Sequence, residues 1–305
     1  MMCIAPINKI LPYSVVDGPG NRVAIFVQKC NIHCLYCHNP ETQNMCINCG
    51  KCVLHCPANA LEILDGKVTW NDNKCIACDT CIHVCENHAS PKVKFMSANE
   101  VYEKVKESIP FIRGISVSGG ECDLYPDFLL ELFKLCKKDN LTCLMDCNGT
   151  IDLSQYPELI NLSDGVMLDI KAWDKEIFKR LTGFDNDVVK KNLAYLEQVN
   201  KIEELRIVSL EDYVDAENVI KGISDTLGIV TKETTLLKLI RFRNFGVRGI
   251  LEKTKSPSLD YMEKLKKLAE SNGFANVIIV WAIGFNTMIQ SINSCGQSIT
   301  FMWFG

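Results

Sequence analysis

The order of apolar and polar residues predicts alternating strands and helices. Arg22 to Gln28 is a short apolar run of the kind that forms a buried parallel strand, and Gly114 to Ser118 is a second. Pro126 to Lys138 predicts an amphipathic helix, with apolar side chains along one side, proline in its first turn and lysines at its end. Ser97 and Glu100 have the spacing of a capping box, which marks another helix start. This alternation favours an α/β fold with a parallel sheet.

Further strands and helices are predicted toward the C-terminus. The strands are Leu141–Asp146, Gly165–Ile170, Glu204–Ser209 and Thr235–Phe242, and the helices are Asn186–Val199 and Ser258–Ser271. Residues 281–305 show no usable period.

Polar or glycine-rich motifs stand where several of these strands end. They are the loop that begins at Cys30, Gly119-Gly120-Glu121, Asp146-Cys147-Asn148-Gly149 and Asp169-Ile170-Lys171. The carboxyl ends of parallel strands share one edge, where α/β barrels carry their chemistry, so we expect these motifs to lie together. Two glycines after a strand also let a ligand approach the backbone. Ordinary helix caps and turns remain an alternative explanation for any single motif.

Length and composition limit the possible folds, partners and functions. The 305 residues suffice for one large α/β domain, or for one domain with an insert. The net charge of −4 and the lack of a basic tract argue against a nucleic-acid partner. No signal segment is recognisable, and the most apolar stretch, Val277–Ile289, is too short to span a bilayer, so no membrane partner is expected. Seventeen cysteines in such a chain predict metal ligands in a reducing compartment, the cytoplasm.

Three cysteines in one short loop predict an iron–sulfur cluster. Cys30, Cys34 and Cys37 follow the first apolar strand closely enough to wrap one cubane. A four-iron, four-sulfur (4Fe-4S) cluster normally takes four thiolates, so three would leave one iron open for chemistry. A zinc loop that borrows a fourth ligand, or three structural thiols, would explain the same loop.

Eight further cysteines form a tandem repeat within residues 46–88, called the insert below. Cys46, Cys49, Cys52 and Cys56 have the same spacing as Cys75, Cys78, Cys81 and Cys85. This is the run of a bacterial dicluster ferredoxin, in which the fourth cysteine of each half binds the other half's cluster. The ligand sets are therefore predicted as Cys46, Cys49, Cys52 and Cys85, and as Cys75, Cys78, Cys81 and Cys56. A zinc ribbon would need only four of these cysteines.

The three-cysteine loop, with Tyr36 before its last cysteine, resembles the signature of the radical S-adenosylmethionine (SAM) superfamily. Within it, several segments resemble the glycyl-radical-enzyme activating enzymes, and Lys171-Ala-Trp173 and Leu181–Asn186 resemble their YjjW branch. The other segments are Asp17–Arg22, His38-Asn39-Pro40, the insert, Ser118–Glu121, Asp146–Gly149 and Met167–Lys171. The resemblance implies an α/β fold, a partial (β/α) TIM-type barrel made by residues 1–45 and 89–305, with the insert as a ferredoxin-type domain carrying two clusters.

The resemblance also implies a reaction. Reductive cleavage of SAM would give a 5'-deoxyadenosyl radical, which removes an α-hydrogen from a glycine of a partner glycyl radical enzyme. Cys30, Cys34 and Cys37 would hold the catalytic cluster, the third 4Fe-4S cluster of the chain. The SAM contacts carried over by position are Tyr36, His38, Gly119, Gly120, Glu121, Asp169, Ile170 and Lys171.

Two more sites and a second partner follow from the same family. Asp146, Met167 and Asp169 match the positions where some members bind Na⁺ or K⁺ beside the SAM carboxylate. Asp17, Gly18 and Gly20 would flank the partner's glycine loop. A flavodoxin- or ferredoxin-like protein would supply electrons. Two other hypotheses stay open: an iron–sulfur electron carrier, and a radical SAM enzyme that acts on another substrate.

Overall fold

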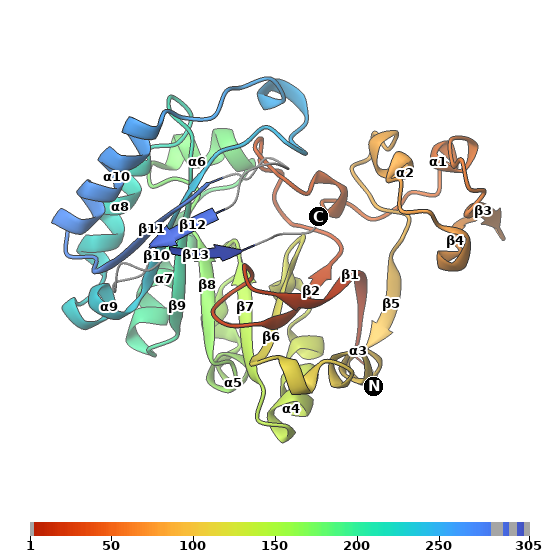
Figure 1. Ribbon diagram of the computed structural model, residues 1–305, viewed down its shortest axis with the longest axis horizontal. Helices are drawn as coiled ribbons and strands as arrows, with labels where there is room; N and C mark the ends of the chain where they lie inside the picture. Colours follow the sequence, from red (N-terminus) through yellow and green to blue (C-terminus); the bar gives the residue numbers. More distant parts are fainter. Residues whose placement is uncertain (1–2, 282–288, 293–297, 302–305) are drawn as a thin grey trace.

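A nine-stranded sheet organises the protein, as the computed structural model shows (Figure 1). The structure describes residues 3–281, 289–292 and 298–301. The strand order is β11-β10-β9-β8-β7-β6-β2-β1-β5, and every neighbouring pair from β2 to β11 is parallel. The strands are β1 (Ile4–Ser14), β2 (Arg22–Val27), β5 (Lys94–Ser97), β6 (Gly114–Gly119), β7 (Thr142–Cys147), β8 (Gly165–Asp169), β9 (Ile202–Ser209), β10 (Leu236–Arg241) and β11 (Asn276–Val280). Because β11 and β5 stand at opposite ends of the order, the sheet curves without closing, as expected for a partial barrel.

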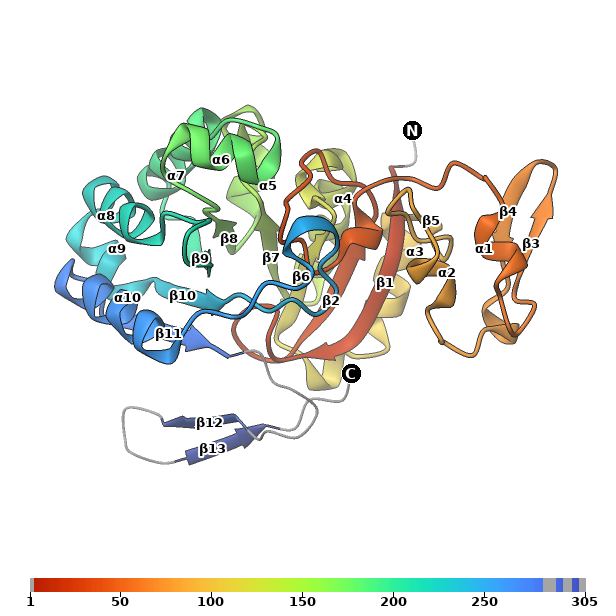
Figure 2. The same ribbon diagram turned by 90° about the horizontal axis from the view of Figure 1, so that it is seen from above.

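Helices follow the strands and cover the outer face of the curved sheet (Figure 2). They are α3 (Ala98–Lys106), α4 (Pro126–Lys138), α5 (Pro157–Leu162), α6 (Lys175–Thr182), α7 (Asp187–Gln198), α8 (Ala216–Thr226), α9 (Ile229–Thr234) and α10 (Leu259–Ser271). Their apolar sides and the outward side chains of the strands form one large core, which includes the fully buried Phe133 and Phe178. The predicted mostly parallel α/β fold is confirmed.

Several elements agree with the sequence predictions and one large strand does not. Helix α4 has the predicted bounds, and Ser97 and Glu100 form a complete capping box at the start of α3. Strand β1 was not expected, although it is the longest in the sheet. Its register against β2 shifts twice, and each irregularity interrupts the alternation of inward and outward residues on which a sequence pattern depends.

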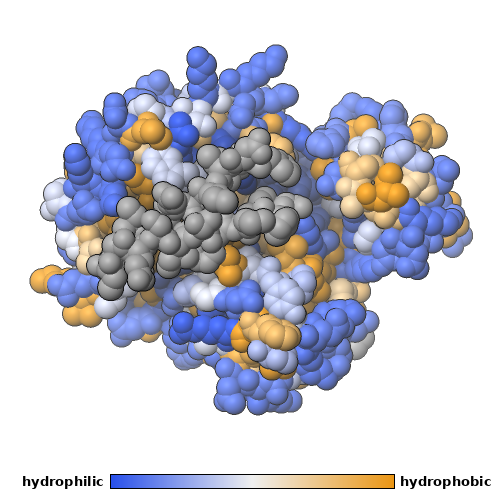
Figure 3. All heavy atoms as spheres, in the orientation of Figure 1, coloured by the Kyte–Doolittle hydropathy of each residue, from blue (hydrophilic) through white to orange (hydrophobic). Residues whose placement is uncertain are grey.

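The insert forms a small lobe beside the sheet (Figures 1 and 3). It contains α1 (Lys51–Leu54), the hairpin of β3 (Leu61–Leu64) and β4 (Lys67–Trp70), and α2 (Thr80–His83). Its two ends lie side by side, since the amide of Asn44 donates to the carbonyl of His88 at 3.1 Å and Asn87 Nδ2 donates to the carbonyl of Met45 at 2.9 Å. The lobe is therefore attached to the sheet by a narrow, paired neck.

The C-terminal segment adds β12 (Ile289–Ile292) and β13 (Ser298–Phe301), which pair with each other. The rest of residues 282–305, which the sequence assigned to the barrel segment, lies outside the described residues. Within the described part of the chain, no helix combines the length and apolar character needed to cross a bilayer.

Candidate active site

A cavity opens at the carboxyl ends of the parallel strands. It brings together most of the residues that the sequence singled out: Cys30, Cys34, Tyr36, Cys37, His38, Gly119, Gly120, Glu121, Asp146, Asp169 and Lys171. These residues come from the ends of β2, β6, β7 and β8 and from the loop after β2. The expectation that the strand-end motifs lie together is met, because parallel strands deliver their carboxyl ends to one edge.

The cysteine loop is anchored by main-chain hydrogen bonds to distant segments. The amide of Cys30 donates to the carbonyl of Gln43 at 2.9 Å, and the amide of Leu35 donates to the carbonyl of Leu181, at the end of α6, at 2.9 Å. These contacts fix the loop before any ligand binds. Burial raises the pKa of Cys30 and Cys37 to about 11 and that of Cys34 to about 12. The thiols therefore stay protonated without metal, and iron must displace protons when it binds.

Charged and polar groups on the cavity wall suit a zwitterionic ligand. Lys171 Nζ lies 2.9 Å from Asp169 Oδ2, and both side chains line the cavity. Burial alone would lower the pKa of Lys171, but Asp169 and neighbouring acidic groups raise it well above its ordinary value. Among the residues that the structure describes, none is a hydrogen-bond partner of the buried Tyr36 hydroxyl. Three convergent thiols, a carboxylate–ammonium pair and an orphaned hydroxyl together fit a 4Fe-4S cluster and the amino-acid part of SAM. Ile170, by contrast, is buried in the core and does not line the cavity.

The two glycines after β6 are required by packing as much as by a ligand. A Cβ on Gly119 would lie 2.3 Å from backbone atoms of Val27, and one on Gly120 would lie 2.1 Å from the carbonyl oxygen of Lys29. Gly119 also has φ of +118°, which disfavours a side chain. The end of β6 thus presses against the start of the cysteine loop, and only glycine permits this approach.

Two of the three residues predicted to hold Na⁺ or K⁺, Asp146 and Asp169, line the cavity. The guanidinium of Arg206 contacts two of the three, with Nη1 2.7 Å from Asp146 Oδ2 and Nη2 3.0 Å from Met167 Sδ. Asp169 pairs with Lys171 instead. Arg206 also binds Glu204 at 2.9 Å, and Glu204 binds Lys238 at 2.8 Å. Sequence analysis missed Arg206 as a site residue, although its place on β9, next to the strand that carries Asp169, was an available signal.

The turn at Asp17–Gly20 reaches into the concave side of the sheet. Ser116 donates its hydroxyl to the carbonyl of Asp17, and a Cβ on Gly18 would lie 3.2 Å from Met167 Sδ. Gly18 and Gly20 have φ of +105° and +82°, so the turn depends on both glycines. The turn therefore stands beside Met167, which contacts Arg206, a residue that lines the cavity.

Two side chains complete the surroundings of the cysteine loop. His38 Nε2 lies 3.0 Å from the carbonyl of Arg243, and burial followed by the charge of Arg243 lowers the pKa of His38 to about 4. Asn148 was named only as part of a strand-end motif and given no role of its own, yet its Nδ2 lies 3.8 Å from Cys30 Sγ and donates to Asn31 Oδ1 at 3.0 Å. Its position directly after the Asp146-Cys147 strand end was the signal that could have identified it.

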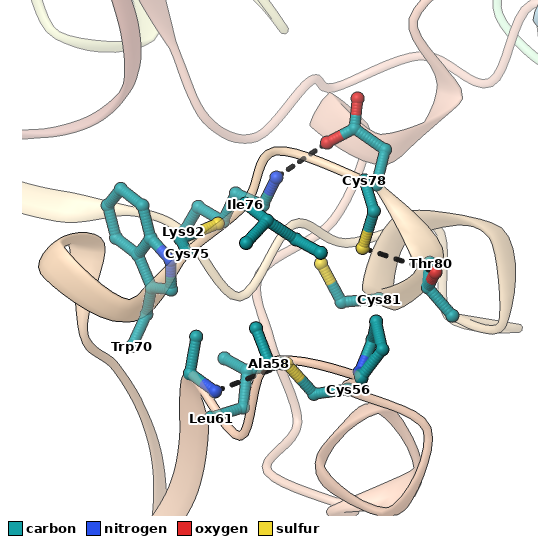
Figure 4. Close-up of a pocket in the computed structure, with 13 residues that line it drawn as sticks. Cys56, Ala58, Leu61, Trp70, Cys75, Ile76, Cys78, Thr80, Cys81 and Lys92 are labelled. Carbon is teal, nitrogen blue, oxygen red and sulfur yellow. Dashed lines mark hydrogen bonds and ion pairs between the residues drawn. The ribbon is translucent and has the colours of Figure 1, made fainter.

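The cysteines of the insert gather into the two predicted sets. Cys56, Cys75, Cys78 and Cys81 line one cavity, into which their side chains point (Figure 4). Cys46, Cys49, Cys52 and Cys85 line another. Each set thus takes three thiols from one half of the repeat and one from the other. Among the described cysteines, none forms a disulfide.

The sequence repeat of the insert is also a repeat of backbone conformation. Residues with positive φ, in the left-handed region, recur in pairs: Asn48 and Ala77, Gly50 and Asp79, and Asn59 and His88. The members of each pair are 29 positions apart (77 − 48, 79 − 50, 88 − 59), as are Cys46 and Cys75. Sulfur contacts occur in both halves: Asn48 N donates to Cys46 Sγ at 3.4 Å in the first half, and Cys78 Sγ lies 3.3 Å from Thr80 Oγ1 in the second.

Comparison with known protein families identifies the sheet domain. The family described as the radical SAM superfamily matches residues 24–218, which span the cysteine loop, the insert and strands β6 to β9. The chain belongs to the radical SAM superfamily. Its members use a 4Fe-4S cluster and SAM, the two groups for which the cavity offers thiols and a charged pair.

Individual relatives within the superfamily are activating enzymes by name. A Haemophilus influenzae protein, provisionally named a glycyl-radical enzyme activating enzyme, is 29% identical over 80% of this chain and 84% of its own length. The indoleacetate decarboxylase activating enzyme of Tractidigestivibacter scatoligenes is 27% identical over 90% of this chain and 97% of its own. Streptococcus suis SuiB, solved with S-adenosylmethionine, shares the fold at a TM-score of 0.51 and 14% identity, over 83% of this chain and 48% of SuiB. The resemblance stated from the sequence is thereby confirmed at the level of the family.

Proposed function

We propose that this protein is an activase that cleaves SAM reductively and removes an α-hydrogen from a glycine of a partner glycyl radical enzyme. The observation that carries the proposal is the single cavity in which Cys30, Cys34 and Cys37 meet the Asp169–Lys171 pair. Bound together, the cluster and SAM supply one-electron chemistry that ends in a 5'-deoxyadenosyl radical. The names of the relatives support a protein glycine as the hydrogen donor.

The chain's own residues bind and shield the reactants. Cys30, Cys34 and Cys37 would hold three irons and leave the fourth for the amino and carboxylate groups of SAM. Lys171 and Asp169 would orient these groups, with Tyr36, His38 and the backbone at Gly119–Glu121 as further contacts. Apolar side chains on the cavity wall, including Ile32, Val208 and Ile240, would exclude water from the reaction.

The Asp17–Gly20 turn is the proposed contact site for the glycine loop of the partner enzyme. It packs against Ser116 and Met167, and Met167 contacts Arg206 in the wall of the cavity. The Na⁺ or K⁺ ion remains a prediction of the family resemblance. To bind at Asp146, Met167 and Asp169, such an ion would have to replace the contacts that Arg206 makes with the first two.

We further propose that residues 46–88 form a ferredoxin-type domain with two 4Fe-4S clusters, inserted between barrel segments 1–45 and 89–305. The two four-thiol cavities, the backbone repeat and the paired neck support it. These clusters would pass electrons from a flavodoxin- or ferredoxin-like protein to the catalytic cluster. Thiols that must stay reduced fit the cytoplasm.

The proposal is tested anaerobically on the full-length protein, loaded with iron and sulfide to about twelve irons per chain. Dithionite, SAM and a glycyl radical enzyme from the same organism, labelled with α-deuterated glycine, are then added. We expect 5'-deoxyadenosine that carries deuterium, and a glycyl radical signal on the partner by electron paramagnetic resonance. Cys34→Ala should abolish both products, whereas Cys136→Ala, a buried thiol outside the cavity, should retain them.

Each alternative makes a different prediction in the same experiment. Unlabelled 5'-deoxyadenosine, with no radical on any glycyl radical enzyme of the organism, would point to another substrate. No nucleoside at full iron content would support an electron carrier. Either result would contradict the proposed function.

A further inference from the structure

Four acidic side chains meet behind the candidate active site, where the turn after β6 touches the end of β7. Glu121, Cys122 and Asp123 belong to the turn, and Cys147 ends the strand. The carboxylate of Glu121 and the thiols of Cys122 and Cys147 place their ligand atoms within 4.8 Å of one another. All four residues are at most 2% exposed. The proposed activase chemistry assigns no role to Cys122, Asp123 or Cys147.

This cluster lacks the positive charge that burial of so many acids requires. Within the described residues, no lysine or arginine forms an ion pair with Glu121 or Asp123, and one oxygen of Glu121 and both oxygens of Asp123 have no hydrogen-bond donor. A cation bound by Glu121 would satisfy its unpartnered oxygen.

The donor set and its spacing specify the kind of cation. Two thiolates and a carboxylate are ligands typical of zinc. Two sulfurs bound to a tetrahedral zinc at about 2.3 Å lie about 3.8 Å apart. The Sγ atoms of Cys122 and Cys147 are 3.7 Å apart. Glu121 and Cys147 also line the large cavity, which gives an ion a path to the site.

We propose that Glu121, Cys122 and Cys147 bind one zinc ion, separate from the iron–sulfur clusters. The ion would join the Gly119–Glu121 turn to the strand end that carries Asn148. The backbone N–H of Asn148 already donates to Glu121 Oε2 at 2.8 Å. Asp123 contacts Glu121 from outside the ligand set. The site would hold the turn that faces SAM in one position.

The test uses full-length protein loaded with iron and sulfide, incubated with Zn²⁺ alone as the probe, desalted and analysed for both metals by mass spectrometry. We expect about one zinc per chain in addition to iron. In the Cys122→Ser/Cys147→Ser double variant zinc should fall to background while iron is retained. The matched control is Cys136→Ala/Cys143→Ala, a second pair of interacting buried thiols, which should keep its zinc. No zinc in the wild type, or equal zinc in the Cys122/Cys147 variant, would overturn the proposal.

X-ray absorption at the zinc edge of the wild-type protein identifies the zinc ligands directly, so it tests the proposed site even if the variant fails to fold. Two sulfurs at about 2.3 Å and lighter ligands at about 2.0 Å would support the site. Four sulfurs would place the zinc in the cluster cysteines and overturn it. Neither readout depends on SAM cleavage, so the proposed activase function can fail while this inference stands.

Discussion

The sheet domain and the insert bury different kinds of side chains. The core of the sheet domain is continuous from β1 to β11 and consists mainly of aliphatic and aromatic residues, with four cysteines among them. The buried core of the insert is Cys52, Leu61 and Cys81, and two of these three are predicted metal ligands. Large apolar side chains such as Leu54, 86% exposed, and Ile47, 65% exposed, lie on its surface. Figure 3 shows apolar side chains on the surface of the lobe.

This difference implies different sources of stability. A domain below about 40 residues seldom buries enough apolar surface to fold alone, and the insert is close to that size. Metal binding then supplies free energy of folding directly, because the ligand set does not exist in the unfolded chain. The sheet domain has no such need, and its cysteine loop is held by hydrogen bonds to Gln43 and Leu181. Iron binding would therefore be needed for the insert to fold. In the sheet domain, iron would bind to a cysteine loop that is already folded.

Removal of iron gives the largest expected effect. In metal-free protein, amides of residues 46–88 should exchange hydrogen at the rate of an unfolded chain, whereas those of β6 to β8 should stay protected, because only the insert lacks an apolar core. Hydrogen-exchange mass spectrometry with and without reconstitution measures both regions in one sample. Persistent protection of the insert without metal would show that its fold does not need clusters.

A core substitution tests the barrel side of the comparison. Phe178 in α6 is fully buried, so Phe178→Ala should lower the free energy of unfolding of the sheet domain by about 3–5 kcal/mol. Chemical denaturation of metal-free protein, followed by circular dichroism, gives the value. Phe245→Ala removes a ring that is 74% exposed and should change stability by less than about 0.5 kcal/mol. Equal effects of the two substitutions would contradict the view that side-chain packing holds this domain.

The smallest expected effect concerns the contact between the two regions. Arg248, in the loop after β10, donates from Nη1 to the carbonyl of Cys85 at 2.9 Å and from Nη2 to that of Ile82 at 2.6 Å. Arg248→Ala should increase exchange at residues 82–85 of the iron-loaded protein about tenfold, equivalent to about 1.4 kcal/mol, because two charge-assisted hydrogen bonds are lost. Lys253→Ala, an exposed cation in the same segment, is the control. If both variants exchange alike, Arg248 does not hold the lobe.

Many features of this protein could be predicted from the spacing of residues that are close in sequence. Helix α4, the start of α3, the α/β alternation and the two sets of insert cysteines could all be predicted, because capping, periodicity and ligand spacing involve residues that are close in sequence. The assembly of strand-end motifs into one cavity was predictable too, since parallel strands place their carboxyl ends at one edge.

Other features depend on contacts between distant segments. No local sequence pattern predicts the register shifts of β1 or the packing of Gly120 against Lys29. The same holds for the hydrogen bonds from Arg248 to the insert. The same is true of Arg206, which joins Asp146 to Met167 from a neighbouring strand, and of Cys122, which meets Cys147 only because β6 and β7 are adjacent. Sequence determined which chemical groups this protein carries and roughly where each strand ends. Only the tertiary structure decided which charges and thiols face one another, because those pairings depend on strand order and on side-chain direction across the sheet.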